Sequence, residues 1–163
     1  MRNGFTLIES VMTLVIIGIL AAIALPAIGP SLSALRLEAA RQKLQGDIIY
    51  SQALSVTQQV NHGVIFNPGS NTYSVYRQTT SNIVNNPLTS KPFTVNYSSD
   101  LDLKGVSLVS TSFGSPTTDR VEFDSFGAPS DGTTALAADG TVTLSAGGAN
   151  ATVTVTKNTG KAG

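Results

Sequence analysis

Three patterns of hydrophobic and polar residues follow one another along the chain. In the first, residues 10–35 carry no charge, and residues 11–25 are apolar apart from Thr13. Apolar character persists to Ile28, which gives roughly the 20 residues that a helix needs to span a bilayer. This pattern predicts a long apolar helix at the N-terminus.

The second pattern extends the helix to about residue 59. Its apolar positions recur with the 3.6-residue period of a helix that buries one face, and the stripe then drifts by one position. We expect Pro26, Gly29 and Pro30 to kink or locally melt the helix between its two halves. The apolar positions of the second half are Leu37, Ala40, Leu44 and Ile48, followed by Ile49, Ala53, Val56 and Val60.

Beyond residue 60 the period changes to two, which is typical of β-strands. Residues 64–66 and 72–77 flank the turn-forming residues 67–71 and predict a hairpin. Further strands are expected at residues 93–97, 106–109, 120–124, 141–145 and 152–156. In the last pair, one face is formed by Val142, Leu144, Val153 and Val155.

These patterns predict an α+β fold. A long N-terminal helix, with a membrane-spanning half and an amphipathic half, packs on a small antiparallel β-rich C-terminal domain. The amphipathic stripe of the helix supplies the cover that the apolar face of an antiparallel sheet needs.

Composition narrows the range of functions. Ten basic and ten acidic residues give a net charge of zero, so the whole chain has no general attraction to nucleic acid or anionic lipid. There are no cysteines, which excludes disulfides and thiolate metal sites. Charged residues are 12% of the chain, about half the usual share. Such a surface suits a protein that packs against copies of itself or works outside the cytosol.

Glu9 is an exception to the apolar pattern of the N-terminal helix, because this acidic residue stands at the N-terminal edge of the apolar run. An acidic residue at mid-bilayer costs about 2.5–3.5 kcal/mol on insertion scales, so we expect Glu9 to have a partner. A secretory signal peptide, with Arg2 in its basic region and Ala22-Ile23-Ala24 as its cleavage site, is one alternative. A plain membrane anchor is another, and it also leaves Glu9 unexplained.

The stretch Gly4-Phe5-Thr6-Leu7-Ile8-Glu9, after a short basic leader, resembles the processing site of type IV prepilins and pseudopilins. The resemblance implies that a membrane prepilin peptidase cuts between Gly4 and Phe5 and N-methylates Phe5. It also implies that the C-terminal domain faces away from the cytoplasm. Gly18 and Pro26 fall where helices of this family carry helix-weakening residues.

The same resemblance divides the chain into four parts. Residues 1–4 are the prepilin leader, and residues 5–29 are an apolar transmembrane or filament-core helix. Residues 30–60 are an amphipathic helix that continues into the globular domain, and residues 61–163 are the β-rich globular domain. No cofactor and no metal are implied.

Cleavage after Gly4 would also give Glu9 a partner. The new α-amino group of Phe5 would titrate near 8 and stay cationic, with or without methylation. Glu9 of one subunit is then expected to pair with the Phe5 amine of an adjoining subunit and fix their axial register. A contact with the amine of the same chain, four residues away, is the alternative.

The second half of the chain is similar to the minor pseudopilin H and FimT-like (GspH/FimT) group. The likeness rests on Arg41 and Asp47, on Phe123-Asp124-Ser125-Phe126-Gly127, and on Thr159-Gly160-Lys161. It implies a non-enzymatic minor subunit of a type IV pilus or a type II secretion pseudopilus. The implied partners are other pilin subunits, the prepilin peptidase, an inner-membrane assembly platform, and the membrane before assembly. The implied location is the bacterial inner membrane, crossed once with the C-terminal domain in the periplasm or outside, or a filament.

Two other subunit types remain open. A major type IV pilin is one, although major pilins often close their last loop with a cysteine pair, which this chain lacks. A FimT-like DNA-binding minor pilin is the other, with Lys157 and Lys161 as the DNA contacts. The tail has no arginine and no aromatic residue to stack on a base, so nucleic acid is not expected as a partner.

Catalytic residues are not predicted. His62, the one histidine, precedes Gly63 at a helix-to-strand transition and is expected to be a surface or cap residue. No nucleophile elbow, P-loop or H-E-x-x-H motif occurs. Asp100 with Asp102, and Asp124 with Asp131, could offer oxygen ligands to Ca²⁺, but acids in such turns are usually turn formers.

Overall fold

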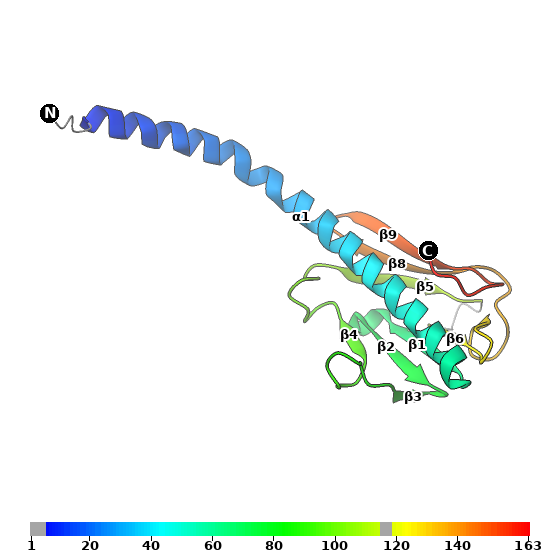
Figure 1. Ribbon diagram of the computed structural model, residues 1–163. Coiled ribbons are helices and arrows are strands. Elements are labelled where there is room, and N and C mark those ends of the chain that lie inside the picture. The colour runs from blue at the N-terminus through cyan, green and yellow to red at the C-terminus, as the bar shows by residue number, and fades with distance from the viewer. Residues whose placement is uncertain (1–5, 115–118) are drawn as a thin grey trace.

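Helix α1 (Leu7–Gln58) dominates the computed structural model, which describes residues 6–114 and 119–163 and, for residues 23–31, the backbone alone. At 1.5 Å per residue its length is about 80 Å. Figure 1 shows its first half protruding from the β-rich domain and its second half lying across the strands. The C-terminus lies on the domain, beside β9.

Local sequence accounts for both ends of α1. Thr6 is the N-cap, and its Oγ accepts the Glu9 N–H at 3.4 Å. Thr6 and Glu9 have the spacing of a capping box. At the other end Gln59 adopts a left-handed conformation, φ 54°, and its N–H returns to Ser55 O.

The backbone of α1 stays helical through Gly18, Pro26, Gly29 and Pro30. The local melting expected at the prolines is therefore wrong. A proline removes one backbone hydrogen bond, but the remaining turns carry the helix across the gap. Figure 1 shows instead that the helix axis curves before it reaches the domain.

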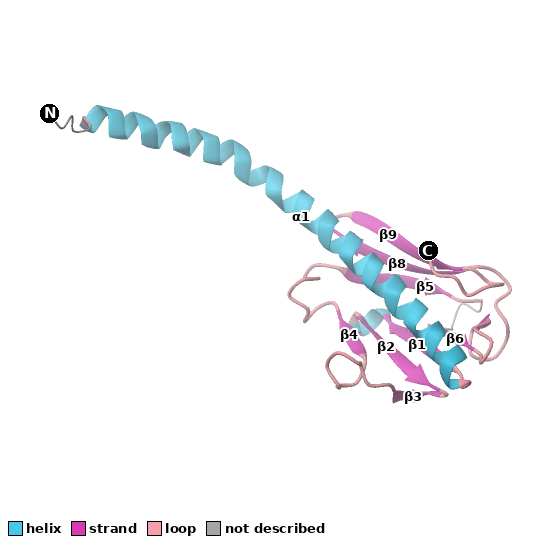
Figure 2. Ribbon diagram, viewed as in Figure 1, coloured by secondary structure: helices cyan, strands magenta, loops and turns pink. Residues whose placement is uncertain are grey.

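The strands form two antiparallel sheets (Figure 2). One has the order β3-β2-β1-β6-β7, with β4 also paired to β2, and the other has the order β5-β8-β9. A short 3-10 helix, η1 (Pro68–Ser70), joins β1 and β2. The strands are β1 (His62–Asn67), β2 (Thr72–Arg77), β3 (Thr79–Ile83), β4 (Thr94–Asn96), β5 (Ser107–Ser112), β6 (Arg120–Phe123), β7 (Pro129–Ser130), β8 (Gly140–Ala146) and β9 (Ala149–Val155).

Both predicted hairpins are confirmed. β1 pairs with β2, with Val64 opposite Val75, and β8 pairs with β9, with Val142 opposite Val153. The second turn is tighter than expected, because Gly147 and Gly148 alone connect the strands, with φ 59° and 84°. Positive φ at both residues is the requirement of the two-residue turn that matches strand twist.

The core lies between α1 and the strands. Leu37, Ala40, Leu44 and Ile48 are buried as predicted, and they face the apolar sides of the sheets. The predicted face of the last hairpin is also confirmed, because Val142, Leu144, Val153 and Val155 are each 0% exposed.

The predicted drift of the helical stripe is wrong. The buried face continues as Ser51 and Ser55, while Ile49 and Val56 are exposed. Ser55 Oγ donates to Ser51 O at 3.1 Å and accepts the His62 N–H at 3.1 Å. Ser55 suits this part of the face because the start of β1 comes close to the helix there and the His62 N–H needs a hydrogen-bond acceptor.

Candidate functional site

The protruding half of α1 carries a continuous apolar surface. From Leu7 to Leu20 its large apolar side chains are between 47% and 83% exposed. Soluble monomers rarely expose so large an apolar patch, and such patches usually mark an interaction site. The exposed side chains are Leu7, Ile8, Val11, Met12, Leu14, Val15, Ile16, Ile17, Ile19 and Leu20.

Glu9 lies in the first turn of this helix. A carboxylate in that position is stabilised by the partial positive charge of the helix N-terminus, a contribution that the sequence analysis missed. Thr13 Oγ donates to Glu9 O at 2.6 Å. Gly4 and Phe5 lie outside the described residues, so the expected pairing of Glu9 with the Phe5 amine stays a prediction.

Gly18 and Pro26, which the sequence analysis expected to weaken the helix, also lie on this half of α1. Gly18 has open space around it, with nothing within 4 Å of the position that a Cβ would take. Pro26 lies within the helix, in the segment where only the backbone is described. Over residues 6–114 and 119–163, no helix combines the length and the hydropathy that crossing a membrane demands.

Arg41 and Asp47, both on the second half of α1, have different surroundings. The Arg41 guanidinium forms two hydrogen bonds to the exposed carboxylate of Glu38, at 2.8 and 2.9 Å, and these lower the pKa of Glu38 to about 2. Asp47 is largely enclosed, and burial raises its pKa, although Tyr73 Oη donates to it at 2.5 Å. Lys43 Nζ lies 3.6 Å from the same carboxylate. Asp47 therefore ties the helix to β2.

The other two motif segments meet at Gln52. Its Nε2 donates to Gly127 O and to Thr159 O, both at 2.8 Å. Asp124 Oδ1 accepts the N–H groups of Phe126 and Ala128 at 2.9 Å and so closes the first turn. Gln52, which the sequence analysis did not single out, thus holds both turns against α1 through hydrogen bonds.

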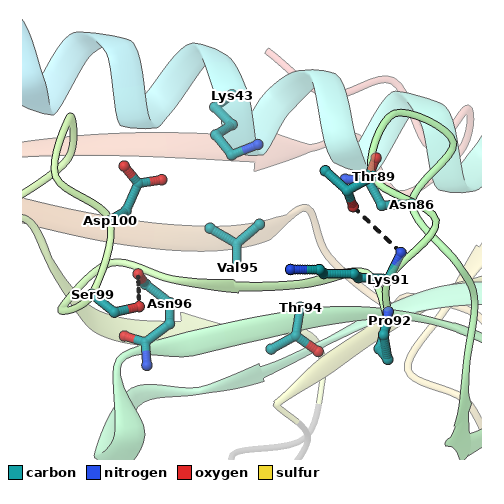
Figure 3. A pocket seen from close by; sticks show the side chains of 10 residues that line it. All are labelled: Lys43, Asn86, Thr89, Lys91, Pro92, Thr94, Val95, Asn96, Ser99 and Asp100. Carbon is teal, nitrogen blue, oxygen red and sulfur yellow. Dashed lines mark hydrogen bonds between the residues drawn. The ribbon is translucent and has the colours of Figure 1, made fainter.

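A shallow pocket of about 340 Å³ lies between α1 and the segment that joins β3 to β4. Figure 3 shows Lys43 facing it from the helix, Lys91 extending across it, and Asp100 at its far side. Val95 lies between them. Two ammonium groups and one carboxylate are suited to a polar or anionic group rather than to acid–base catalysis. The remaining lining residues are Asn86, Thr89, Pro92, Thr94, Asn96 and Ser99.

His62 is not the surface or cap residue that was expected. It is buried at the start of β1, with Nδ1 2.8 Å from Val60 O, and burial lowers its pKa. In the sequence, His62 comes shortly after the predicted end of the helix, so it was expected to lie on a loop. In the structure, β1 pairs with β2 on one edge and with β6 on the other, and this places His62 in the interior.

The acidic turns act as turn formers. Asp131 Oδ1 accepts the N–H and Oγ of Thr133 and the N–H of Thr134, at 2.7–2.8 Å, and these bonds lower its pKa to about 2. Asp100 Oδ1 accepts the Asp102 N–H at 3.0 Å. Within the described part of the chain, no group of three His, Asp or Glu side chains is placed to bind a metal.

The C-terminal residues do not form a free tail. Thr154 and Gly163 exchange two backbone hydrogen bonds, at 2.8 and 2.9 Å, and Gln45 Nε2 donates to Ala162 O at 3.1 Å. Lys157 Nζ donates to Ala137 O at 3.2 Å, which occupies one of its donors. Lys161 is exposed.

Comparison with known proteins gives two consistent likenesses. Residues 1–25 match the prokaryotic N-terminal methylation motif. The fold resembles the minor pseudopilin EpsH from the type 2 secretion system of Vibrio cholerae, with a TM-score of 0.54, 13% identity, and coverage of 75% of this chain and 90% of that one.

It also resembles the type IV minor pilin FimU of Pseudomonas aeruginosa, with a TM-score of 0.51, 14% identity, and coverage of 78% of this chain and 90% of that one. No protein of curated function matches the chain in sequence. At such low sequence identities, the two structures support the assignment of the fold alone. The methylation motif supports the assignment of the N-terminal segment.

Proposed function

We propose that this chain, which has a prepilin-type N-terminus and a pilin-like fold, is a non-enzymatic minor pilin or pseudopilin subunit. The observation that carries the proposal is the protruding half of α1, whose apolar side chains are exposed all round on an otherwise folded domain. Packing of this half-helix among those of other subunits would bury that surface.

The apolar surface also suggests the order of events. Before assembly the segment would lie in the inner membrane, since residues 10–35 carry no charge. A prepilin peptidase would remove residues 1–4 and methylate Phe5, and an inner-membrane assembly platform would then transfer the subunit into a type IV pilus or a secretion pseudopilus. Gly18 and Pro26 would let the half-helix adapt its curvature to its neighbours.

Within the filament, Glu9 would pair with the Phe5 amine of an adjoining subunit. A buried charge pair adds little net stability, but losing one partner leaves an uncompensated charge, which costs about 3–5 kcal/mol. Apolar packing would therefore supply most of the holding energy, and the charge pair would set the axial register of the subunits.

The test is incorporation of Glu9 variants into the filament fraction of cells, with processing followed by intact mass. We expect Glu9→Ala to be cleaved after Gly4 and to fold, but to be incorporated at least a hundredfold less, as tenfold per 1.4 kcal/mol implies. Glu9→Gln is the sharper variant, because glutamine keeps the capping box with Thr6 and removes only the charge.

The matched control is Glu38→Ala, which removes an exposed acid from the same helix and should be incorporated normally. Incorporation of processed Glu9→Gln at the wild-type level would overturn the charge pair. A mature chain that begins at Leu25 would mean that an ordinary signal peptidase had acted, and the filament proposal would fail.

A further inference from the structure

The two ends of β4 build opposite walls of the shallow pocket beside α1. Before β4, the Asn86 N–H donates to Lys91 O at 2.8 Å, which closes the preceding loop. After β4, Asn96 O accepts the Asp100 N–H at 3.1 Å, which closes the following turn. Val95, the middle residue of β4, lies between the two walls (Figure 3). Backbone hydrogen bonds therefore fix the positions from which the charged side chains reach the pocket.

Two ammonium groups line the pocket, and they are paired differently. Lys91 is exposed, and its side chain has no ion pair or hydrogen bond to any residue among 6–114 and 119–163. Lys43 lies 3.6 Å from Asp47, which is longer than the about 2.7–2.9 Å of a strong charge-assisted hydrogen bond. An ammonium group has three donors, so Lys43 keeps donors for a ligand. Since Asp47 offsets part of the charge of Lys43, Lys91 is the stronger contact for an anion.

Asp100 limits the charge of the ligand that the pocket accepts. Its Oδ1 accepts the Asp102 N–H at 3.0 Å, and its Oδ2 has no hydrogen bond within the described part of the chain. Two lysines and one aspartate leave a single net positive charge among the lining residues. A carboxylate carries one negative charge and matches it. A phosphate group carries about −1.5 to −2 at neutral pH, and its excess charge would be repelled by Asp100.

Two highly exposed leucines stand next to the pocket, one at each side. Leu88 precedes Thr89 and is 92% exposed, and Leu101 follows Asp100 and is 82% exposed. Figure 3 shows Thr89 and Asp100 on opposite sides of the pocket. Burial of apolar surface is the main favourable term in most protein association, so a ligand that also covers the leucines binds better than one that fills the pocket alone.

We propose that this pocket binds a carboxylate, with Lys91 and Lys43 as its cationic contacts. The exposed leucines favour an acidic side chain of an extended peptide, flanked by apolar residues, as the source of that carboxylate. A free carboxylate is a second source of the same chemistry. The pocket lies on the β-rich domain and not on the protruding half of α1, so the site does not depend on the proposed role in assembly.

Peptide binding to the full chain in nonionic detergent micelles tests the site. The probe is a fluorescent peptide, blocked at both ends, with the core Leu-Glu-Leu, and fluorescence anisotropy gives its Kd. Micelles without protein supply the background. We expect a Leu-Gln-Leu peptide to bind at least tenfold more weakly, because glutamine has nearly the same shape and no charge. Added salt should weaken the binding of Leu-Glu-Leu, since exposed charges are screened. Equal affinities for the two peptides would overturn the carboxylate site.

Two substitutions in the pocket should act in opposite directions. Lys91→Met should weaken the binding of Leu-Glu-Leu about fivefold, the size of an exposed ion pair. Asp100→Asn should strengthen it about threefold, because asparagine keeps the oxygen that accepts the Asp102 N–H and removes the repelling charge. The matched controls are Lys161→Met and Asp139→Asn, which change the net charge equally at exposed positions outside the pocket. Controls that shift the Kd as much as the pocket variants would show a general charge effect and overturn the site.

Competition and a third peptide separate the two sources of the carboxylate. A Ser-Glu-Ser peptide should bind about tenfold more weakly than Leu-Glu-Leu, and Leu88→Ser should reduce that difference. Equal binding of the two peptides would overturn the peptide as the source and assign the pocket to free carboxylates. At matched ionic strength, sodium acetate should displace the probe at lower concentration than sodium phosphate. The reverse order would overturn the preference for a carboxylate.

Discussion

At the scale of single residues, the junction between α1 and β1 is the most constrained part of the domain. His62 and Ser55 are fully buried there and share one hydrogen bond, from the His62 N–H to Ser55 Oγ. Gly63 follows, on a strand that pairs with β2 on one edge and with β6 on the other. A Cβ on Gly63 would lie 2.5 Å from Val121 O and 2.6 Å from the Tyr76 ring.

Gly63→Ala should therefore destabilise the domain by about 1–3 kcal/mol, the usual range for overpacking, or more because one of the crowded atoms is backbone. Urea denaturation followed by circular dichroism would measure the effect. Gly69→Ala in η1 is the control, because its nearest contact is an ordinary 3.4 Å, and its midpoint should barely move. Equal midpoints for the two variants would contradict the close approach of β1 to β6.

At the scale of elements, α1 is one helix with three kinds of surface. The protruding half is apolar all round, the inner face of the second half is buried, and the outer face of that half is exposed. The inner and outer faces are told apart by two adjacent isoleucines. Ile48 is 0% exposed and Ile49 is 45% exposed.

Ile48→Ala should cost about 2–5 kcal/mol, since it empties a packed site, whereas Ile49→Ala should stay within roughly 0.5 kcal/mol. The two variants share the same chemistry and nearly the same helix propensity, so they control for each other. The measurement is the free energy of unfolding of each variant of the domain. A larger loss of stability for Ile49→Ala than for Ile48→Ala would mean that the buried stripe of the helix shifts to Ile49, as the sequence suggested.

At the scale of the whole molecule, buried ionisable groups link folding to pH. Burial lowers the pKa of His62 from its ordinary 6.5 in the folded domain. The unfolded chain then binds more protons below that pH, so stability falls as the pH falls through 6.5. Asp47 acts in the opposite direction, because burial raises its pKa and protonation relieves the buried charge.

His62→Gln should thus show a smaller loss of stability than the natural chain between pH 7.5 and 5.5. The size of this pH effect, rather than the stability at one pH, is the informative quantity, because the substitution itself also removes buried contacts. Thermal unfolding of both proteins across that range would measure the difference in pH dependence. Both proteins contain Asp47, so its titration affects both curves equally. Parallel curves for the two proteins would show that His62 titrates normally in the folded state.

Much of the fold was predictable because its signals are local. The change of period near residue 60 separated helix from strands, and both hairpins were predicted from alternation and from turn residues between the strands. β3 was missed because its side chains are polar and largely exposed, and β7 because two residues carry no period. The Gly4, Phe5 and Glu9 motif was likewise visible as a contiguous string of residues.

The sequence by itself determined where the helix and the hairpins form and which end of the chain carries the methylation motif, because short-range periodicity, capping and contiguous motifs act within a few residues. Tertiary structure decided which helix face is inner and which is outer. The sequence shows apolar residues on both faces after Ile48, and only the approach of β1, with its demand for the Ser55 hydroxyl, selects between them. Tertiary structure also decided that Gln52 joins two turns 32 residues apart, between Gly127 and Thr159, since hydrogen bonds between distant segments leave no local pattern.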